Sequence, residues 1–298
     1  MHGKFIFVGD HKYWVKGTTY GTFAPDNEGA QFPAPEVVES DFAKMAQSGF
    51  NTVRTYTAPP ARILDAALRH NLRIMVGLPW EQHIAFLDDK AAKSRIENAI
   101  RESVRKCAGH PAVLCYTLGN EIPASIVRWH GREAIQRFLH RLYKIAKAQD
   151  PEGLFTYVNF PTTEYLQLPF LDFLSFNVYL ETHEKLAAYL ARLQNIAGEK
   201  PLLMAEIGLD SRRNGLQEQA DSLEWQIETA FAAGCAGAML FAWTDEWYRG
   251  GADIDDWDLG LTTRARKPNP ALEIASRAMR RVPFSTDIEW PHVSVVVC

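Results

Sequence analysis

The chain has 298 residues, of which 47% are hydrophobic and 23% are charged. This composition is typical of a soluble globular protein and excludes a disordered chain or a small disulfide scaffold. The net charge of −4 comes from 32 basic and 36 acidic side chains without a polybasic run, so we expect neither a nucleic-acid partner nor an anionic membrane partner.

The remaining bulk features favour a cytoplasmic protein. The first apolar run, Phe5–Val8, is too short for the core of a signal peptide. No run approaches the roughly 18 apolar residues of a membrane span. The four cysteines have no metal-ligand spacing, so we expect reduced, mostly buried thiols. They are Cys107, Cys115, Cys235 and Cys298.

Residues 1–13 predict a short N-terminal β-hairpin, because Lys4–Val8 and Lys12–Lys16 flank the turn Gly9-Asp10-His11. Eight further strand candidates follow, and most of them precede an amphipathic helical stretch. These candidates are Trp14–Tyr20, Thr52–Thr57, Arg73–Leu78, Val113–Leu118, Phe155–Asn159, Phe173–Tyr179, Leu202–Ile207 and Ala238–Trp243.

This alternation predicts an α/β fold with a parallel sheet. Eight consecutive units favour a closed (β/α)₈ TIM barrel over residues 14–282, since doubly wound open sheets usually have fewer strands. The connection between the fifth and sixth strands is short, and Thr163–Leu168 leaves room for only one helical turn.

Residues 283–298 follow the last predicted helix, Pro268–Arg281, and are expected to form a C-terminal linker. The run Val293–Cys298 reads as a buried strand, which an eight-stranded barrel does not need. It resembles the opening strand of glycosyltransferases of the GT-A fold, which implies a fused glycosyltransferase domain after Cys298. An edge strand on the outside of the barrel is the alternative.

Two strands of the predicted barrel end in a glutamate. The fourth runs into Leu118-Gly119-Asn120-Glu121, and the seventh contains Met204-Ala205-Glu206-Ile207. Active sites of such barrels lie at the carboxyl ends of the strands, so both side chains are expected in one cleft. Paired carboxylates are typical of glycoside hydrolysis, whereas the alternative is a salt bridge at the barrel rim for each.

Other barrel chemistries need different residues. Strands three to seven have no lysine at their ends for a Schiff base, and the histidines have no metal-ligand spacing. The acidic loop Asp253–Asp258 lacks the glycine and the terminal glutamate of an EF-hand loop. We therefore expect no metal and no cofactor.

The motifs resemble those of clan A glycoside hydrolases, above all the barrels of the β-galactosidase, β-glucuronidase and β-mannosidase group. The resemblance covers residues 14–280. It rests on five motifs that occur in the same order as in the clan. They are Val53-Arg54-Thr55-Tyr56, His110-Pro111-Ala112-Val113 with Leu118-Gly119-Asn120-Glu121, Phe176-Asn177-Val178-Tyr179, Ala205-Glu206-Ile207 and Phe241-Ala242-Trp243-Thr244-Asp245.

The resemblance implies a retaining mechanism with Glu206 as nucleophile and Glu121 as acid and base. On this assignment, the charge of Glu206 raises the pKa of Glu121. The remaining implied contacts involve Arg54 and Tyr179 with the nucleophile, Asn120 with the sugar 2-hydroxyl, and Trp243 as an apolar floor for the sugar ring.

Further substrate contacts are expected from Trp80, Glu81 and Asn177. A wider set of candidates comprises Tyr20, Asn159, Glu246 and Trp247.

Three functions remain open from the sequence. The first is a retaining β-glycosidase that hydrolyses a β-linked oligosaccharide or glycan. The second is a transglycosylase, which uses the same residues but passes the sugar to a hydroxyl group instead of water. The third is a non-catalytic glycan-binding barrel that serves an appended glycosyltransferase, although two intact glutamates argue against it.

Overall fold

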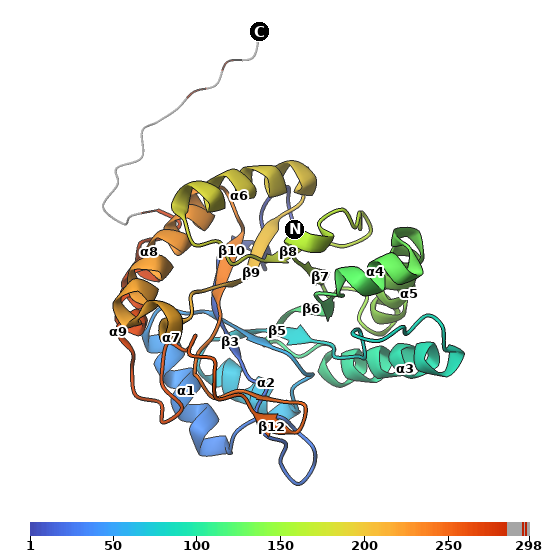
Figure 1. The fold of residues 1–298 in the computed structure, drawn as a ribbon, viewed down its shortest axis with the longest axis horizontal. Helices are drawn as coiled ribbons and strands as arrows, with labels where there is room; N and C mark the ends of the chain where they lie inside the picture. The colour runs from blue at the N-terminus through green and yellow to red at the C-terminus, as the bar shows by residue number, and fades with distance from the viewer. Residues whose placement is uncertain (285–293, 295, 297–298) are drawn as a thin grey trace.

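The computed structural model describes residues 1–284, 294 and 296. Its centre is a closed barrel of eight parallel strands in the order β10-β3-β4-β5-β6-β7-β8-β9, which confirms the predicted (β/α)₈ fold (Figure 1). The strands are β3 (Val15–Tyr20), β4 (Thr52–Thr55), β5 (Arg73–Gly77), β6 (Val113–Asn120), β7 (Phe155–Asn159), β8 (Leu174–Asn177), β9 (Leu202–Ile207) and β10 (Gly237–Leu240).

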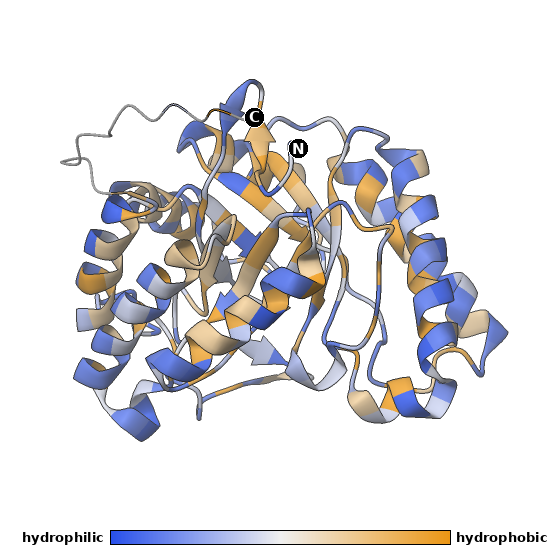
Figure 2. Ribbon diagram, turned by 90° about the horizontal axis from the view of Figure 1, so that it is seen from above, coloured by the Kyte–Doolittle hydropathy of each residue, from blue (hydrophilic) through white to orange (hydrophobic). Residues whose placement is uncertain are grey.

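Helices surround the barrel, with hydrophobic strands inside the ring and many hydrophilic residues on the helices (Figure 2). They are α1 (Pro35–Gln47), α2 (Ala61–Arg69), α3 (Lys90–Cys107), α4 (Ala124–His130), α5 (Arg132–Gln149), α6 (His183–Ala197), α7 (Ser211–Asn214), α8 (Leu216–Ala232) and α9 (Pro270–Arg281). The short connection between β7 and β8 holds only the 3₁₀ turn η1 (Pro161–Thr163). No helix of the described residues has the length and apolar character needed to cross a membrane.

Helix starts follow local chemistry. Pro35 and Pro270 stand at the first positions of α1 and α9, where a fixed φ suits the helix and the missing N–H is not needed. The Asp89 carboxylate caps α3 by accepting a hydrogen bond from the Ala91 N–H at 2.8 Å. These signals fix where α1, α3 and α9 begin, and the loops that precede the helices at one end of the barrel form the candidate site.

The predicted hairpin is present as β1 (Phe7–Val8) and β2 (His11–Lys12), which pair in antiparallel fashion. Just before it, Ile6 is only 1% exposed and belongs to the same apolar cluster as Val15 and Met75 of the barrel strands. The N-terminal end of the barrel is therefore filled with apolar side chains, and polar chemistry is left to the opposite end.

The chain leaves β10 for a long connection to α9. This connection contains a second small hairpin, β11 (Tyr248–Arg249) with β12 (Ala252–Asp253), which the sequence did not predict. Two backbone hydrogen bonds tie the connection together, from Ala242 N–H to Leu259 O and from Leu261 N–H to Ala242 O. The expected strand over 293–298 lies outside the described residues except for positions 294 and 296.

Candidate active site

A pocket of about 650 Å³ opens at the carboxyl ends of the strands, a size common for small-molecule sites. Both predicted glutamates line it. The other lining residues come from the strand ends and the loops that follow, namely Thr22, Arg54, Thr55, Tyr56, Gly77, Leu78, Pro79, Trp80, Gln82, His83, Thr117, Gly119, Asn120, Phe160, Tyr179, Phe241, Trp247, Arg249, Trp257 and Leu259.

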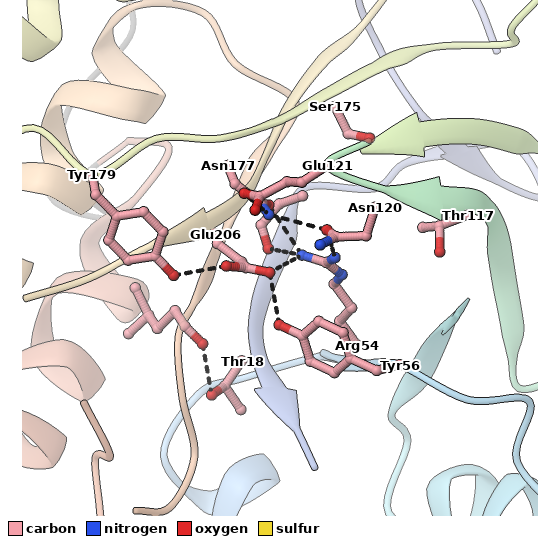
Figure 3. A network of polar contacts seen from close by, with 12 residues as sticks. Thr18, Arg54, Tyr56, Thr117, Asn120, Glu121, Ser175, Asn177, Tyr179 and Glu206 are labelled. Atoms are coloured by element: carbon pink, nitrogen blue, oxygen red, sulfur yellow. Dashed lines mark hydrogen bonds and ion pairs between the residues drawn. The ribbon is translucent and has the colours of Figure 1, made fainter. Parts of the chain in front are cut away.

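Glu206 lies near the end of β9, is 6% exposed and accepts hydrogen bonds from three side chains (Figure 3). Its Oε1 accepts from Arg54 Nη1 at 2.9 Å and from the Tyr56 hydroxyl at 2.7 Å. Its Oε2 accepts from the Tyr179 hydroxyl at 2.7 Å. Burial alone would disfavour the carboxylate, but a guanidinium and two hydroxyl donors compensate for it and fix its orientation.

Arg54 is the organising cation of the site. It is 1% exposed and, besides Glu206, its Nη1 donates to the Ala205 carbonyl at 2.8 Å and to Asn177 Oδ1 at 3.2 Å. Its Nη2 donates to Asn120 Oδ1 at 2.6 Å. Because four acceptors surround the guanidinium, it is held rigidly and has little capacity left for a ligand.

Tyr56 is a site residue that was not predicted from the sequence, although it stands two positions after Arg54. Alternate residues of an extended chain face the same side, which is the signal that was available. The Arg54 guanidinium lies 4.7 Å from the centre of the Tyr56 ring. A Cβ on Gly77 of β5 would lie 2.6 Å from Tyr56 Cα, so only glycine leaves room for this turn of the chain.

Glu121 directly follows β6 and has a left-handed backbone with φ of 53°. This conformation is costly for a residue other than glycine and is often found at functional sites. Its N–H donates to the Val158 carbonyl at 2.9 Å. Its Oε1 accepts from Asn177 Nδ2 at 2.8 Å (Figure 3). Asn177 thus lies between Glu121 and Arg54, and contacts both.

The pKa of Glu121 is raised, mainly because the carboxyl is buried and then because of the negative charge of Glu206. The charge of Glu206 was the only cause expected from the sequence, and burial is the larger of the two. The Asn177 hydrogen bond and the charges of Arg54 and Arg249 act in the opposite direction. Two carboxyl groups of one pocket therefore have different surroundings, one with three donors and one with a single neutral donor.

Asn120 is fixed from both sides. Its Oδ1 accepts from Arg54 and from Asn177 Nδ2, the latter at 3.0 Å. Its backbone N–H donates to Gln82 Oε1 at 3.0 Å, and Gln82 Nε2 donates back to its carbonyl. Among the described residues Asn120 Nδ2 has no partner, so this group is free to donate to a ligand. Gln82 was also missed, because it is far from Asn120 in the sequence.

Two substrate contacts were predicted in the loop after β5, and only one of them lies in the pocket. Trp80 lines the pocket, and its indole N–H donates to the Leu118 carbonyl at 2.9 Å. The prediction for Glu81 is wrong: its side chain is half exposed, lies outside the pocket and approaches Arg95 of α3 at 3.7 Å. His83 lines the pocket instead, as do Pro79 and Gln82 of the same loop.

The prediction of Trp243 as the sugar floor is also wrong. Trp243 has no exposed surface and packs edge-on against Phe50 in the core, at 6.4 Å between ring centres. The strand β10 ends at Leu240, so the alternation of a strand does not extend to residue 243. The aromatic lining here comes from Phe241, Trp247 and Trp257.

The wider set of candidates divides in the same way. Trp247 lines the pocket, whereas the other three bind partners outside it. The partners are Asp41 for Tyr20, Thr163 for Asn159 and Arg266 for Glu246.

The charged lining residues are two carboxylates, Glu121 and Glu206, and two guanidinium groups, Arg54 and Arg249. Within the described part of the chain no three His, Cys, Asp or Glu side chains are grouped so that they could hold a metal ion. The donor set therefore suits acid-base and nucleophilic chemistry by the two glutamates.

The comparisons with known proteins agree with this geometry. The family model "Glycosyl hydrolases family 2, TIM barrel domain" matches residues 6–284. None of the curated protein sequences matches the chain.

Solved structures show the same fold at low sequence identity. A family 2 β-galacturonidase from Eisenbergiella tayi, bound to galacturonate, has a TM-score of 0.79 at 18% identity, covering 95% of this chain and 54% of its own. A β-glucuronidase from Ruminococcus gnavus, in complex with uronic deoxynojirimycin, has a TM-score of 0.75 at 17% identity, covering 93% and 51%. The chain thus spans about half the length of these structures.

Proposed function

Since the chain belongs to glycosyl hydrolase family 2, we propose that it is a retaining β-glycosidase that cleaves a β-linked oligosaccharide or glycan by double displacement. The observation that supports this most is the contrast between the two glutamates of the pocket. Glu206 accepts from Arg54 and two tyrosine hydroxyls, and Glu121 has a raised pKa. A retaining enzyme needs this pair, one group as a carboxylate and one as an acid.

In the first step Glu206 attacks the anomeric carbon, and the bond from that carbon to the leaving oxygen breaks. Glu121 donates its proton to this oxygen, so the leaving sugar departs as a neutral alcohol. Tyr56 and Tyr179 keep their protons, because desolvation of the hydroxyl groups and the charge of Glu206 raise the pKa of both phenols. They therefore remain donors that hold the nucleophile in position.

In the second step the sugar is an ester of Glu206, whose charge is then gone. The contribution of that charge to the pKa of Glu121 disappears with it, so Glu121 becomes the base that takes a proton from water. The oxygen of this water attacks the anomeric carbon, and Glu206 leaves as a carboxylate.

The other lining residues hold the sugar. Asn120, whose Oδ1 is engaged by Arg54 and Asn177, donates its free Nδ2 to the 2-hydroxyl, a bond that strengthens in the oxocarbenium-like transition state. Trp80, Phe241 and Trp247 offer aromatic surface to the C–H faces of a sugar ring.

The test is the intact mass of the protein after incubation with activated 2-deoxy-2-fluoro-β-glycosides. The fluorine slows the second step, so a nucleophile stays labelled. The panel includes the glucuronide and the galacturonide, because the two structural neighbours are named as enzymes for these sugars. We expect the wild type to gain the mass of one fluorosugar and Glu206→Gln, which keeps the shape of the side chain, to gain none.

Other outcomes of the labelling experiment would support a transglycosylase or a non-catalytic binding domain. If the labelled enzyme is released by an added sugar and not by water, the protein is a transglycosylase. If folded wild type takes up no label from the whole panel while Glu121→Gln and Glu206→Gln bind glycans as it does, the barrel is a non-catalytic binding domain and our proposal fails.

A further inference from the structure

Arg249 is a charged residue of the pocket that has no role in the two steps of the proposed mechanism. It belongs to β11 and lines the pocket with its side chain exposed to solvent. Among the described residues it forms no side-chain hydrogen bond and no ion pair. Its partner across the hairpin is Ala252, whereas the acidic neighbour Asp253 lies opposite Tyr248.

The other guanidinium of the pocket, that of Arg54, has a structural role. Arg54 is fully buried and donates to Glu206, Asn120 and Asn177. Arg249 has none of these features, and all five of its N–H donors are available to a ligand. A cation that is exposed, unpaired and directed at a pocket attracts an anionic group of the substrate.

The electrostatic contacts of Arg249 indicate its side of the pocket. Its charge lowers the pKa of the Glu121 carboxyl and, after burial, that of the His83 imidazole. All three residues line the same pocket. If Glu121 is the acid, its proton goes to the leaving oxygen, so Arg249 and His83 flank the space for the leaving sugar.

We propose that Arg249, with His83 beside it, binds a carboxylate on the leaving sugar, so that the substrate is a glycan with a uronic acid on the reducing side of the cleaved bond. This inference rests on the proposed function for the position of the leaving group. It concerns a different sugar from the one that is esterified to Glu206.

The chemistry of the two side chains fits this assignment. A guanidinium is planar and binds a carboxylate through two parallel hydrogen bonds. The lowered pKa of His83 keeps its ring neutral near pH 7, so it offers one N–H donor and one acceptor to sugar hydroxyls.

Binding of an anion also helps the acid. Arg249 is one of the groups that lower the pKa of Glu121, and a bound carboxylate neutralises it. The pKa of Glu121 then rises, and the acid keeps its proton until the leaving oxygen takes it. An acidic leaving sugar would thus be favoured in binding and in the first step.

The experiment uses the fluorosugar-labelled protein, because an acceptor that binds in the space of the leaving sugar releases the label by transglycosylation. The acceptors are methyl β-D-glucuronide and its neutral match, methyl β-D-glucoside. We expect the glucuronide to release the label at about tenfold lower concentration than the glucoside. Arg249→Gln should lose this preference, and Arg249→Lys should keep part of it.

Arg213→Gln is the matched control, since Arg213 is an exposed cation on α7 at the same end of the barrel but outside the pocket lining. It should keep the full preference for glucuronide. Equal release by both acceptors in the wild type, or an unchanged preference in Arg249→Gln, would overturn the inference.

A binding titration separates this inference from the proposed function. If no reagent labels the protein and Glu121→Gln and Glu206→Gln bind glycans as the wild type does, the proposed function fails, but tryptophan fluorescence still reports binding near Trp80, Trp247 and Trp257. Tighter binding of glucuronide than of glucoside, lost in Arg249→Gln, would support a carboxylate site at Arg249. Glucose 6-phosphate and glucose 6-sulfate are further probes, and if either binds more tightly than the glucuronide, the assignment to a uronic acid is wrong.

Discussion

Tyr56 and Tyr179 donate hydrogen bonds to different oxygens of the Glu206 carboxylate, each across 2.7 Å. The two phenols are not equivalent. Tyr56 shares Oε1 with Arg54, whereas Tyr179 is the only donor to Oε2 among the described residues. Loss of the Tyr179 hydroxyl therefore leaves one oxygen of the nucleophile unpaired, and loss of the Tyr56 hydroxyl does not.

We expect Tyr179→Phe to lower the rate of fluorosugar labelling about 100-fold and Tyr56→Phe about 10-fold. Both substitutions keep the ring, so packing is preserved. Labelling rates by intact mass measure the difference, and thermal unfolding serves as the control for folding. Equal effects, or a larger effect of Tyr56→Phe, would contradict the asymmetry.

Glu121→Ala tests the role of the acid. A phenol with a low pKa leaves without a proton, whereas a sugar hydroxyl needs one. We expect the variant to cleave an activated aryl glycoside nearly as fast as the wild type in the first step, and to lose roughly 10³-fold on a disaccharide. Pre-steady-state release of phenol gives the first number, and product analysis by chromatography gives the second. Equal losses on both substrates would argue against an acid at this position.

The pH dependence of this step has a defined sign. Since Glu121 must be protonated, kcat/KM falls as the pH rises through its pKa. Arg249 lowers that pKa, so Arg249→Gln should move the alkaline limb to higher pH, and the exposed Arg213→Gln should leave it in place. The profile is measured with a neutral leaving group, so that binding of an anion does not interfere. A limb that moves to lower pH would refute the electrostatic contact.

Asp245, in the connection after β10, is expected to make the free energy of unfolding depend on pH. Burial raises its pKa from the ordinary 3.8 to about 6, the charge of Asp258 adds to this, and the Gly260 N–H, which donates to Asp245 at 2.7 Å, opposes it. Between these values the folded protein holds a proton that the unfolded chain has lost. The free energy of unfolding therefore decreases as the pH rises from about 4 to about 6.

Asp245→Asn removes this titration and keeps an acceptor for Gly260. Relative to the wild type, its stability should increase over this pH range, by about 1 kcal/mol after solvent screening, or ~2 °C in Tm. Thermal unfolding of both proteins from pH 4 to pH 8 gives the difference. A difference that does not change with pH would show that Asp245 is ionised throughout.

Substitutions of Phe241 and of Trp243 are expected to have different effects, because Phe241 lines the pocket and Trp243 is buried in the core. Phe241→Ala removes aromatic surface from the pocket and should raise the reagent concentration needed for half-maximal labelling about tenfold. Trp243→Phe should lower the free energy of unfolding by about 1–2 kcal/mol through a cavity in the core, and leave labelling unchanged. Impaired labelling by Trp243→Phe, with Phe241→Ala unaffected, would reverse this assignment.

The strands were predictable because the barrel repeats one simple pattern. Thr52–Thr55 and Leu202–Ile207 are short apolar or β-branched runs before polar residues, and the strand ends place Arg54 and Glu206 in one pocket. These positions follow from the topology alone, since every parallel strand delivers its last residues to the same end.

The predictions from the sequence that were wrong or missing concern residues beyond the strand ends. Glu81 and Trp243 lie in loops, where no repeating geometry says which side chain faces inward. Gln82 holds the backbone of Asn120, a contact between distant loops that no local pattern encodes. Arg249 depends on a hairpin inserted after β10, which the sequence pattern did not predict.

The closure of the barrel also has a consequence for synthesis. Residues 237–240 of β10 pair with residues 15–18 of β3, so the ring closes only when both segments are present. Arg54 and Tyr56 leave the ribosome well before their acceptor Glu206, at typical rates by roughly ten seconds or more. Until then the Arg54 guanidinium has no carboxylate to pair with inside a barrel. We therefore expect that a chain still lacking β10 neither binds nor cleaves glycans, and that activity begins only once the ring is complete.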